Sequence, residues 1–515
     1  MPPRPPTGDD EEGGGPPADR AVSGRQHVRA AVFPALQSHG FFGLVLVVGL
    51  TLRVMTTVAY RPALHFIQDS FDYLGDAEAL VPGVVRPLGY PVFLRFLSVA
   101  GDLAVVPVAQ HLLGLATAMI LNLLLRHLGA RPWVAALGAA PVLLDPSQIY
   151  MEQFIMAETL FQFLVVAALA VLVWNDRPSV RSYAAVGALI GAASLTRTVG
   201  LVLLVCVLAY VIVRRVGWKP LLAITAAAAV LIVPYGLWFR SVHGHFGLEA
   251  YRGYFLAGRV LPFADCTSLD LPPLQRTLCD ERPVEERPRA ELYVWSPASQ
   301  LRHWAVPPGT DRNALAQQFA TTVIRNQPGD YLAVVADEML HYFSPRRQSG
   351  PKDFPAETLL FATSFPPGSQ WRALVPPGDP YVWHWTDPGP DVAYSVKLAT
   401  HGFGLRQVDS FLDTPVARIL RTYQGAVHTP GTALALALLT AVVAGAGRLF
   451  RQQRRMRCDA LLFAGSGLAV LLTAAATSNF DYRYLVPAFG LIPPGGVMGA
   501  LLLEQRLRAR RRAVI

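Results

Sequence analysis

Residues 41–60 read FFGLVLVVGLTLRVMTTVAY and contain a single charged side chain, Arg53. A helix of this length crosses about 30 Å of hydrocarbon. Comparable apolar runs, each roughly 17 to 22 residues long, recur as far as Leu503. The 515-residue chain is 52% hydrophobic and 16% charged, whereas soluble domains are about a quarter charged. The sequence therefore predicts an all-α polytopic membrane protein.

The apolar pattern predicts about ten transmembrane helices. They cover residues 41–60, 103–125, 133–144, 154–174, 183–195, 199–213, 221–239, 431–449, 460–477 and 484–503. Residues 183–213 are taken as two short helices because Ser194–Gly200 interrupts the apolar run. Basic residues then fall in alternate gaps, at Arg126, Arg131, Arg177, Arg181, Arg214, Arg215, Lys219, Arg448, Arg451, Arg454, Arg455 and Arg457. The positive-inside rule places these gaps and both termini in the cytoplasm.

This topology divides the chain into five parts. Residues 1–38 are rich in Pro, Gly and acids and are expected to form a disordered cytoplasmic tail. Residues 39–240 form an N-terminal transmembrane module, whose first span we expect to be uncleaved and whose first outer loop is 61–102. An extracytoplasmic loop region covers 241–429, further transmembrane helices cover 430–504, and 505–515 is a basic cytoplasmic tail.

The long outer region carries two cysteines, Cys266 and Cys279. An oxidising compartment would allow them to form a disulfide, although two free thiols are the alternative. Residues 314–325 and 332–343 place apolar side chains at helical spacing, and we expect amphipathic helices there that lie on the membrane or pack over the bundle. No Cys/His spacing in the chain is typical of a zinc site.

The formal net charge is +9. Because the basic residues cluster at the ends of the apolar runs, we interpret them as topology determinants and contacts to membrane lipids, and we expect no nucleic-acid partner.

Two carboxylates, Asp69 and Asp72, follow the first span in the segment Asp69-Ser70-Phe71-Asp72-Tyr73-Leu74. A charge at a membrane surface is costly to dehydrate and is not needed to fold a helix bundle. A carboxylate near other acids and partly dehydrated keeps a proton more readily and can act as a general base. The alternative for Asp69 is a helix cap at the start of residues 70–79. We predict Asp69 and Asp72 as catalytic candidates.

Other candidates fall on the same predicted face. Arg197 and Arg483 are predicted to bind phosphate, since a guanidinium presents a planar fork to such an anion. Snorkelling and an ion pair with Asp481 are the alternative for Arg483, and a structural contact to a neighbouring helix is the alternative for Glu158. The full set of predicted substrate- or phosphate-binding residues is Arg86, Tyr90, Glu158, Arg197, His243, Arg483 and Tyr484.

Carboxylates and arginines at the outer end of a membrane-embedded body favour transfer chemistry on a lipid-linked phosphate. Nucleotides do not reach the outer face, so an activated sugar there must arrive on a lipid. A glycosyl group on an isoprenoid phosphate is therefore the predicted donor.

Five short motifs resemble those of the GT-C superfamily of integral-membrane glycosyltransferases, especially the bacterial branch of aminoarabinose transferase and protein O-mannosyltransferases. They are Asp69-Ser70-Phe71-Asp72-Tyr73-Leu74, Arg86-Pro87-Leu88-Gly89-Tyr90-Pro91, Met156-Ala157-Glu158-Thr159-Leu160-Phe161, Leu195-Thr196-Arg197, and Arg483-Tyr484 leading to Pro487.

The resemblance implies an inverting transferase that uses a polyprenyl-monophosphate sugar, hexosyl or pentosyl, such as mannose or arabinose. It implies that Asp69 deprotonates the acceptor hydroxyl while Arg197 and Arg483 stabilise the leaving phosphate. Asp69 and Asp72 are separated by two residues, unlike the family's adjacent pair, so either can be the base.

Several alternatives stay open. A polysaccharide polymerase or ligase would use the same compartment, and a lipid-linked glycan transporter would need polar residues throughout the membrane depth. The expected acceptor is a cell-envelope glycan, lipid or protein at the plasma membrane. No cofactor is required, and the acid cluster permits a divalent cation.

Overall fold

The helix Gly40–Ala59 corresponds to the predicted first span. It begins the part of the chain that this computed structural model describes, which comprises residues 40–296, 298–364, 381–385, 392–396, 411–446 and 454–514. The predicted tail at 1–38 lies outside the described residues.

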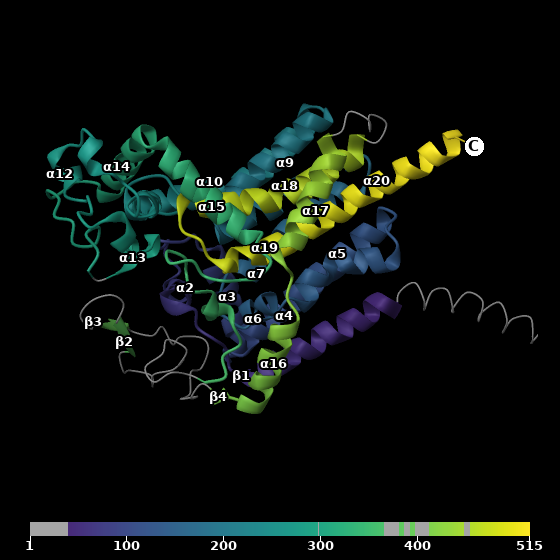
Figure 1. The fold of residues 1–515 in the computed structure, drawn as a ribbon, viewed down its shortest axis with the longest axis horizontal. Coiled ribbons are helices and arrows are strands. Elements are labelled where there is room, and N and C mark those ends of the chain that lie inside the picture. The colour runs from purple at the N-terminus through teal and green to yellow at the C-terminus, as the bar shows by residue number, and fades with distance from the viewer. Residues whose placement is uncertain are drawn as a thin grey trace, which may run out of the picture.

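A bundle of apolar helices forms the body of the molecule (Figure 1). After Gly40–Ala59 come α4 (Val105–His127), α5 (Pro132–Leu144), α7 (Glu158–Trp174), α8 (Val180–Thr196), α9 (Gly200–Arg214), α10 (Trp218–His243), α17 (Gly431–Ala446), α18 (Arg454–Thr477) and α20 (Ile492–Val514). Each predicted apolar helix has a counterpart here. The interruption predicted at Ser194–Gly200 is confirmed, since α8 ends at Thr196 and α9 begins at Gly200.

Length limits the number of these helices that can span a membrane alone. Within the described residues, four are long and apolar enough: Gly40–Ala59, α4, α10 and α18. The number rises to six if each of two bent pairs is one span, namely α16 (Thr414–Ala426) with α17, and η6 (Tyr482–Tyr484) and α19 (Leu485–Phe489) with α20. A helical membrane protein is therefore confirmed, whereas ten spans and the sidedness of the termini stay predictions.

The first outer loop contains β1 (Tyr60–Arg61), α2 (Ile67–Ala79), α3 (Gly89–Leu97) and η1 (Ser98–Ala100), and the short α6 (Pro146–Met151) lies beside its start. The N-cap of α2 is Phe66, and Asp69 lies in the first helical turn. Asp69 is therefore not the cap of this helix, which removes the structural alternative considered for it.

The outer region has its own hydrophobic core, which includes Val260, Leu278, Trp304 and Phe319. Its elements are α11 (Arg252–Val260), η2 (Cys266–Ser268), α12 (Pro273–Arg276), η3 (Val284–Glu286), α13 (Ala290–Trp295), α14 (Arg312–Asn326), α15 (Pro328–Tyr342) and η4 (Ala356–Leu359). The two predicted amphipathic helices are α14 and α15. Cys266 and Cys279 are joined by a disulfide.

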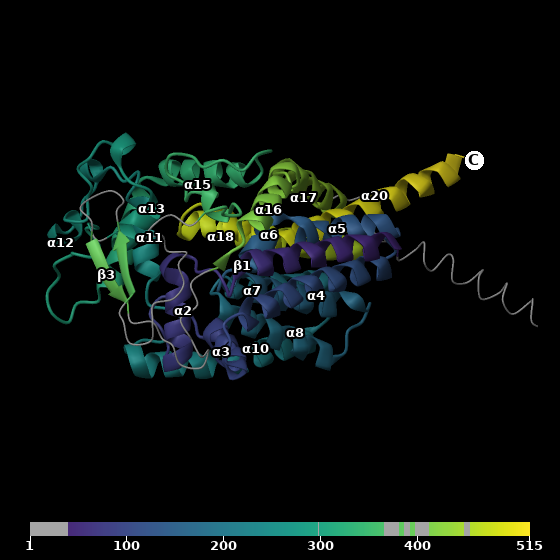
Figure 2. The ribbon, with the colours of Figure 1, turned by 90° about the horizontal axis from the view of Figure 1, so that it is seen from below.

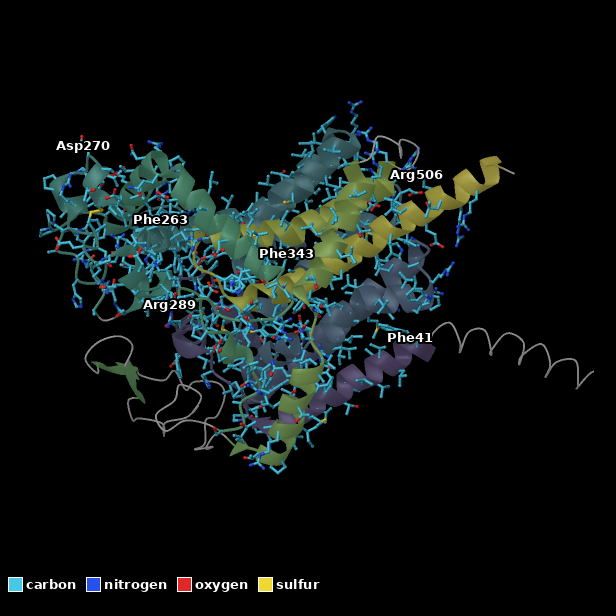
Figure 3. All side chains as sticks on the ribbon, in the orientation of Figure 1. Phe41, Phe263, Asp270, Arg289, Phe343 and Arg506 are labelled. Carbon is cyan, nitrogen blue, oxygen red and sulfur yellow. A yellow bond between two sulfur atoms is a disulfide. The ribbon has the colours of Figure 1, made fainter. Side chains whose placement is uncertain are left out.

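The outer region lies at one end of the bundle, as Figures 1 and 2 both show for α12 and α13. Figure 3 places Phe263 and Asp270 at that end, and Phe41 and Arg506 toward the other. The described helices therefore run between an end that carries the outer region and an end that carries the basic last turns of α20.

Two short antiparallel pairs depart from the all-α prediction. Strand β2 (Tyr381–Trp385) pairs with β3 (Val392–Val396), and β1 pairs with β4 (Phe411–Leu412). Tyr60 is opposite Leu412 in the second pair. This pair ties the chain that returns from the outer region to the end of the first helix.

Candidate active site

A cavity of about 840 Å³ lies where the first outer loop, the junction of α8 and α9, the end of α18 and the outer region meet. Six of the predicted site residues line it: Asp69, Asp72, Arg86, Arg197, Arg483 and Tyr484. The cavity thus brings together side chains from segments more than 400 residues apart, since Asp69 and Arg483 are 414 positions apart in sequence.

Both oxygens of the Asp69 carboxylate contact arginines. Arg86 Nη2 lies 2.5 Å from Oδ1, and Arg483 Nη1 donates to Oδ2 at 2.7 Å. Arg86 Nη1 also lies 3.5 Å from Asp72 Oδ2. Asp69 is therefore clamped between two guanidinium groups, and Asp72 contacts one of them from a more exposed position.

This clamp corrects one sequence-based expectation. Asp69 was expected to keep a proton more readily because of burial and neighbouring acids. Burial would indeed raise the pKa of the Asp69 carboxyl, but Arg86 and Arg483 outweigh burial and hold the pKa below its ordinary value. In the arrangement seen here, Asp69 is ionised and a weak base.

Arg483 owes its position to the turn before α19. Asp481 Oδ1 accepts from the Arg483 backbone N–H at 2.8 Å, and Asp481 Oδ2 lies 2.9 Å from Arg483 Nε. The guanidinium carbon lies 5.1 Å from the ring centroids of both Phe66 and Tyr484. The predicted ion pair with Asp481 is present, yet the guanidinium still reaches Asp69 and the cavity.

Arg197 occupies the break between α8 and α9. It forms an ion pair with the fully buried Glu158, which begins α7, and its guanidinium lies 5.5 Å from the Tyr484 ring centroid. A Cβ at Gly200 would clash with the Ser194 backbone, so glycine allows this turn to close. Glu158 itself does not line the cavity and acts on it through Arg197.

The Arg86 segment packs directly on this break. A Cβ at Gly89 would lie 2.5 Å from the carbonyl carbon of Leu195, so a glycine is needed where α3 meets the end of α8. Arg86 also lies 5.0 Å from the centroid of the Tyr73 ring. Close backbone contact thereby brings the Arg86 and Arg197 loops to the same wall.

Tyr90 and His243 were predicted to contact substrate, and the structure places neither in the cavity wall. The Tyr90 hydroxyl is buried and donates to Gln110 Oε1 at 2.9 Å, while its ring meets Tyr73 edge-on. His243 Nε2 lies 2.6 Å from the Pro82 carbonyl oxygen. Both residues are close in sequence to segments that line the cavity, but the Tyr90 hydroxyl and His243 Nε2 form hydrogen bonds within the protein.

The outer region supplies cavity residues that sequence reasoning missed. Glu249 and Glu291 line the part of the cavity wall that the outer region contributes, together with Arg252, Arg289 and Trp295. Burial raises the pKa of Glu249 although Arg252 lowers it, and burial raises the pKa of Glu291 although its partner Arg289 lowers it. Only the high density of charged and aromatic residues after α10 could have pointed to this wall.

Part of the cavity wall is apolar and belongs to the bundle. Val199, Leu201 and Val202 contribute from the start of α9, and Val470 and Ala474 contribute from the outer half of α18. These two helices pack against each other. The cavity therefore combines an ion-paired polar end with a surface that suits hydrocarbon.

Within the described residues, no group of three or more His, Cys, Asp or Glu side chains is arranged to hold a metal ion. The divalent cation permitted by the sequence stays an untested prediction.

Fold and site together define a helical membrane protein with an arginine–carboxylate centre in a partly apolar cavity. Residues 105–244, from α4 to the end of α10, match the family model of the dolichyl-phosphate-mannose-protein mannosyltransferases. The predicted resemblance to GT-C glycosyltransferases is confirmed over that stretch. No curated protein sequence matches the chain.

Three solved structures are similar at low identity. The Saccharomyces cerevisiae protein O-mannosyltransferase Pmt1-Pmt2 complex bound to the sugar donor is 15% identical over 45% of this chain and 37% of that chain, with a TM-score of 0.32. The Archaeoglobus fulgidus oligosaccharyltransferase is 12% identical over 94% and 52%, with a TM-score of 0.43. ArnT from Cupriavidus metallidurans bound to undecaprenyl phosphate is 15% identical over 90% and 78%, with a TM-score of 0.34. The chain thus spans about half or less of the first two proteins, and we draw no functional conclusion from TM-scores below 0.5.

Proposed function

We propose that this protein is a glycosyltransferase that moves a sugar from a polyprenyl-monophosphate donor to an acceptor hydroxyl at the extracytoplasmic face. The observation that carries the proposal is the cavity itself, whose arginine-lined end adjoins an apolar wall from α9 and α18. A lipid-linked phosphate needs both surfaces, one for its anion and one for its hydrocarbon. The family match over residues 105–244 supports the same chemistry.

Arg197 and Arg483 are the proposed phosphate ligands. Their side chains are 19% and 15% exposed, and both guanidinium groups lie against the Tyr484 ring. Charge-assisted, bidentate contacts from arginine suit a phosphate better than a lysine point charge does. Glu158 and Asp481 hold these arginines in place, so the main rearrangement when the anion arrives is at the contact between Arg483 and Asp69.

In the proposed reaction, the acceptor oxygen forms a bond to the anomeric carbon while the bond from that carbon to the phosphate oxygen breaks, with inversion. The acceptor proton passes to the Asp69 carboxylate, and Asp72 is the alternative base. Polyprenyl phosphate leaves with its added negative charge stabilised by Arg197 and Arg483.

Donor binding has a consequence for Asp69 in this scheme. The donor phosphate competes with the Asp69 carboxylate for Arg483, which loosens one side of the clamp. With one positive charge withdrawn, the pKa of Asp69 rises and the carboxylate becomes a better base. The donor is therefore proposed to bind before the acceptor is deprotonated.

The proposed setting is the plasma membrane, with several passes, both termini in the cytoplasm and the site outside. The acceptor is a cell-envelope glycan, lipid or protein, and the sugar is a hexose or a pentose.

Reconstituted protein should be tested with mannosyl and arabinosyl decaprenyl monophosphate, following the release of decaprenyl phosphate and the anomeric configuration of the product. We expect release from one donor, and a fall of about 10³-fold in kcat for Asp69→Asn with decaprenyl phosphate still bound. Glu281→Gln, at an exposed outer-region carboxylate, is the control. Movement of an intact lipid-linked glycan without bond cleavage would instead identify a transporter, and transfer from pyrophosphate donors alone would favour a polymerase or ligase.

A further inference from the structure

A buried charged cluster lies inside the N-terminal module, away from the residues that line the cavity. Arg53 Nε and Nη2 both donate to the Glu152 carboxylate at 2.8 Å, and His111 Nδ1 lies 2.8 Å from Glu152 Oε2. Arg53 also donates to the carbonyl oxygens of Val142 and Leu143. Arg53 and Glu152 are 1% and 0% exposed, so this first-span arginine neither snorkels to a surface nor lines the cavity.

Burial of such a pair requires a further explanation. An ion pair taken out of water is often no more stable than apolar side chains of the same volume, so it is weak evidence for a stabilising role. Gly114 in α4 leaves room for the Glu152 carboxylate, because a Cβ at this position would clash with Glu152 Oε1. The burial of Arg53 and Glu152 is therefore better explained by the segment that the pair holds in place.

Glu152 begins a non-helical segment, residues 152–157, that leads into α7 at Glu158. This segment pairs with the start of the first outer loop, since Leu64 N–H donates to the Gln153 carbonyl and Ile155 N–H donates to the Leu64 carbonyl, both at 3.0 Å. The Ser70 hydroxyl donates to the Ile155 carbonyl at 2.9 Å. Ser70 is the neighbour of Asp69, so the segment fixes the turn of α2 that presents the carboxylate.

The same segment reaches the Arg86 side of the site. Gln110 Nε2 donates to the carbonyl oxygens of Glu152 at 2.8 Å and Phe154 at 2.6 Å, and Gln110 Oε1 accepts from the Tyr90 hydroxyl. Tyr90 lies in the first turn of α3, four residues after Arg86 in the sequence. Through these hydrogen bonds, Tyr90 connects α3 to the 152–157 segment without contacting substrate.

The end of the segment reaches the third site element. Glu158 follows directly and forms the ion pair with Arg197. Thus a single short segment contacts the supports of Asp69 and Arg86, in the first outer loop, and of Arg197, at the junction of α8 and α9.

We propose that Arg53, Glu152 and His111 are positioning residues that lock the 152–157 segment and thereby set the mutual geometry of Asp69, Arg86 and Arg197. This inference deepens the proposed function and rests on it for its catalytic consequence. Its structural part, the placement of α2 by the buried cluster, is independent of the reaction.

The decisive test replaces both charges together, because removing one partner leaves the other charge buried and unpaired. Full-length Arg53→Met/Glu152→Met protein should be compared with wild type by thermal unfolding, by hydrogen exchange of residues 64–75 and by donor turnover. We expect a folded protein with a somewhat lower Tm, since His111 and the Val142 and Leu143 carbonyls lose their partners. We also expect about tenfold faster exchange in 64–75, and a fall of about 100-fold in kcat with donor KM little changed.

A second variant covers the case in which the double variant does not fold. Ser70→Ala removes only the hydroxyl that donates to Ile155 and accepts from the Phe66 N–H, and we expect faster exchange in 64–75 and a fall of about tenfold in kcat. Thr56→Val is the matched control, since this buried hydroxyl only bonds the carbonyl of Leu52 in its own helix. It should behave as wild type.

The outcomes separate the two proposals. Wild-type exchange in 64–75 for a folded double variant, or for Ser70→Ala, overturns the positioning role whether or not turnover is detected. Faster exchange with unchanged kcat overturns its catalytic consequence. Absence of turnover in the wild type with every lipid donor counts against the proposed function, while the exchange result still decides the positioning role.

Discussion

The two walls of the cavity are built differently. On the bundle side, Asp69, Arg86, Arg197 and Arg483 each have an ionic partner, and the pKa of Asp69 is held low by its arginines. On the outer side, burial outweighs the neighbouring arginines, so the pKa values of Glu249 and Glu291 are raised. The bundle wall therefore carries paired charges suited to one anion, whereas the outer-region carboxyls hold their protons to higher pH than ordinary glutamates do.

The largest expected difference between the walls concerns the lipid phosphate. Arg483→Gln removes a phosphate ligand and half of the Asp69 clamp, and should lower kcat/KM for the donor by about 10³-fold. It should also weaken the binding of decaprenyl phosphate, measured by calorimetry in nanodiscs. Arg289→Gln, its counterpart on the outer wall, should leave that affinity unchanged. Equal loss of decaprenyl phosphate affinity in both variants would remove the distinction between the walls.

The second prediction addresses the separate core of the outer region. Replacing Cys266 and Cys279 together by Ser opens a short cross-linked loop, which should lower the free energy of local unfolding there by about 3 kcal/mol. Hydrogen exchange should speed up in α14 and stay unchanged in α4. Parallel changes in both helices would show that the outer region does not fold on its own core.

The third prediction uses the low pKa of Asp69. A carboxyl with a depressed pKa loses its ionised form only when pH falls through that low value, so the acid limb of kcat/KM lies below the ordinary range of Asp. Arg86→Gln removes one of the two lowering charges and should move the acid limb to higher pH. An acid limb that stays in place would show that Asp69 is not the titrating base.

The smallest expected effect comes from Asp76, on the same helix as Asp69. Burial and then Asp72 raise the pKa of Asp76 to about 6, so the stability contributed by its neutral form is lost as pH rises through about 6. Asp76→Asn should raise Tm by about 2 °C at pH 8 and leave it unchanged at pH 3, where the carboxyl is protonated in both the folded and the unfolded chain. Asp270→Asn, at an exposed outer-region carboxylate, should have no effect at either pH.

The continuous apolar runs predicted the apolar helices well, because a helix that lies in lipid must be apolar along its length. The same reasoning gathered Asp69, Arg86, Arg197 and Arg483 on one face, since each follows or precedes such a run. It could not predict that Asp69 would be clamped, because that depends on a contact between residues 414 positions apart.

Other site features escaped the sequence for physical reasons. Glu249 lies in an irregular segment after α10 and Glu291 in the short helix α13, and no spacing in the sequence marks either as part of a cavity wall. Tyr90 and His243 do not line the cavity, because position near a helix end does not say which way a side chain packs. The bond between Glu152 and Arg53 of the first span joins residues 99 positions apart, and it depends on tertiary packing that the sequence does not show.

The most direct test of the central claim is a cryo-EM structure of the protein in nanodiscs with decaprenyl monophosphate bound. We predict density for the phosphate between Arg197 and Arg483, with the prenyl chain against α9 and α18 and Arg483 drawn away from Asp69. Phosphate density at any other place, with the Arg483–Asp69 contact intact, would contradict the account.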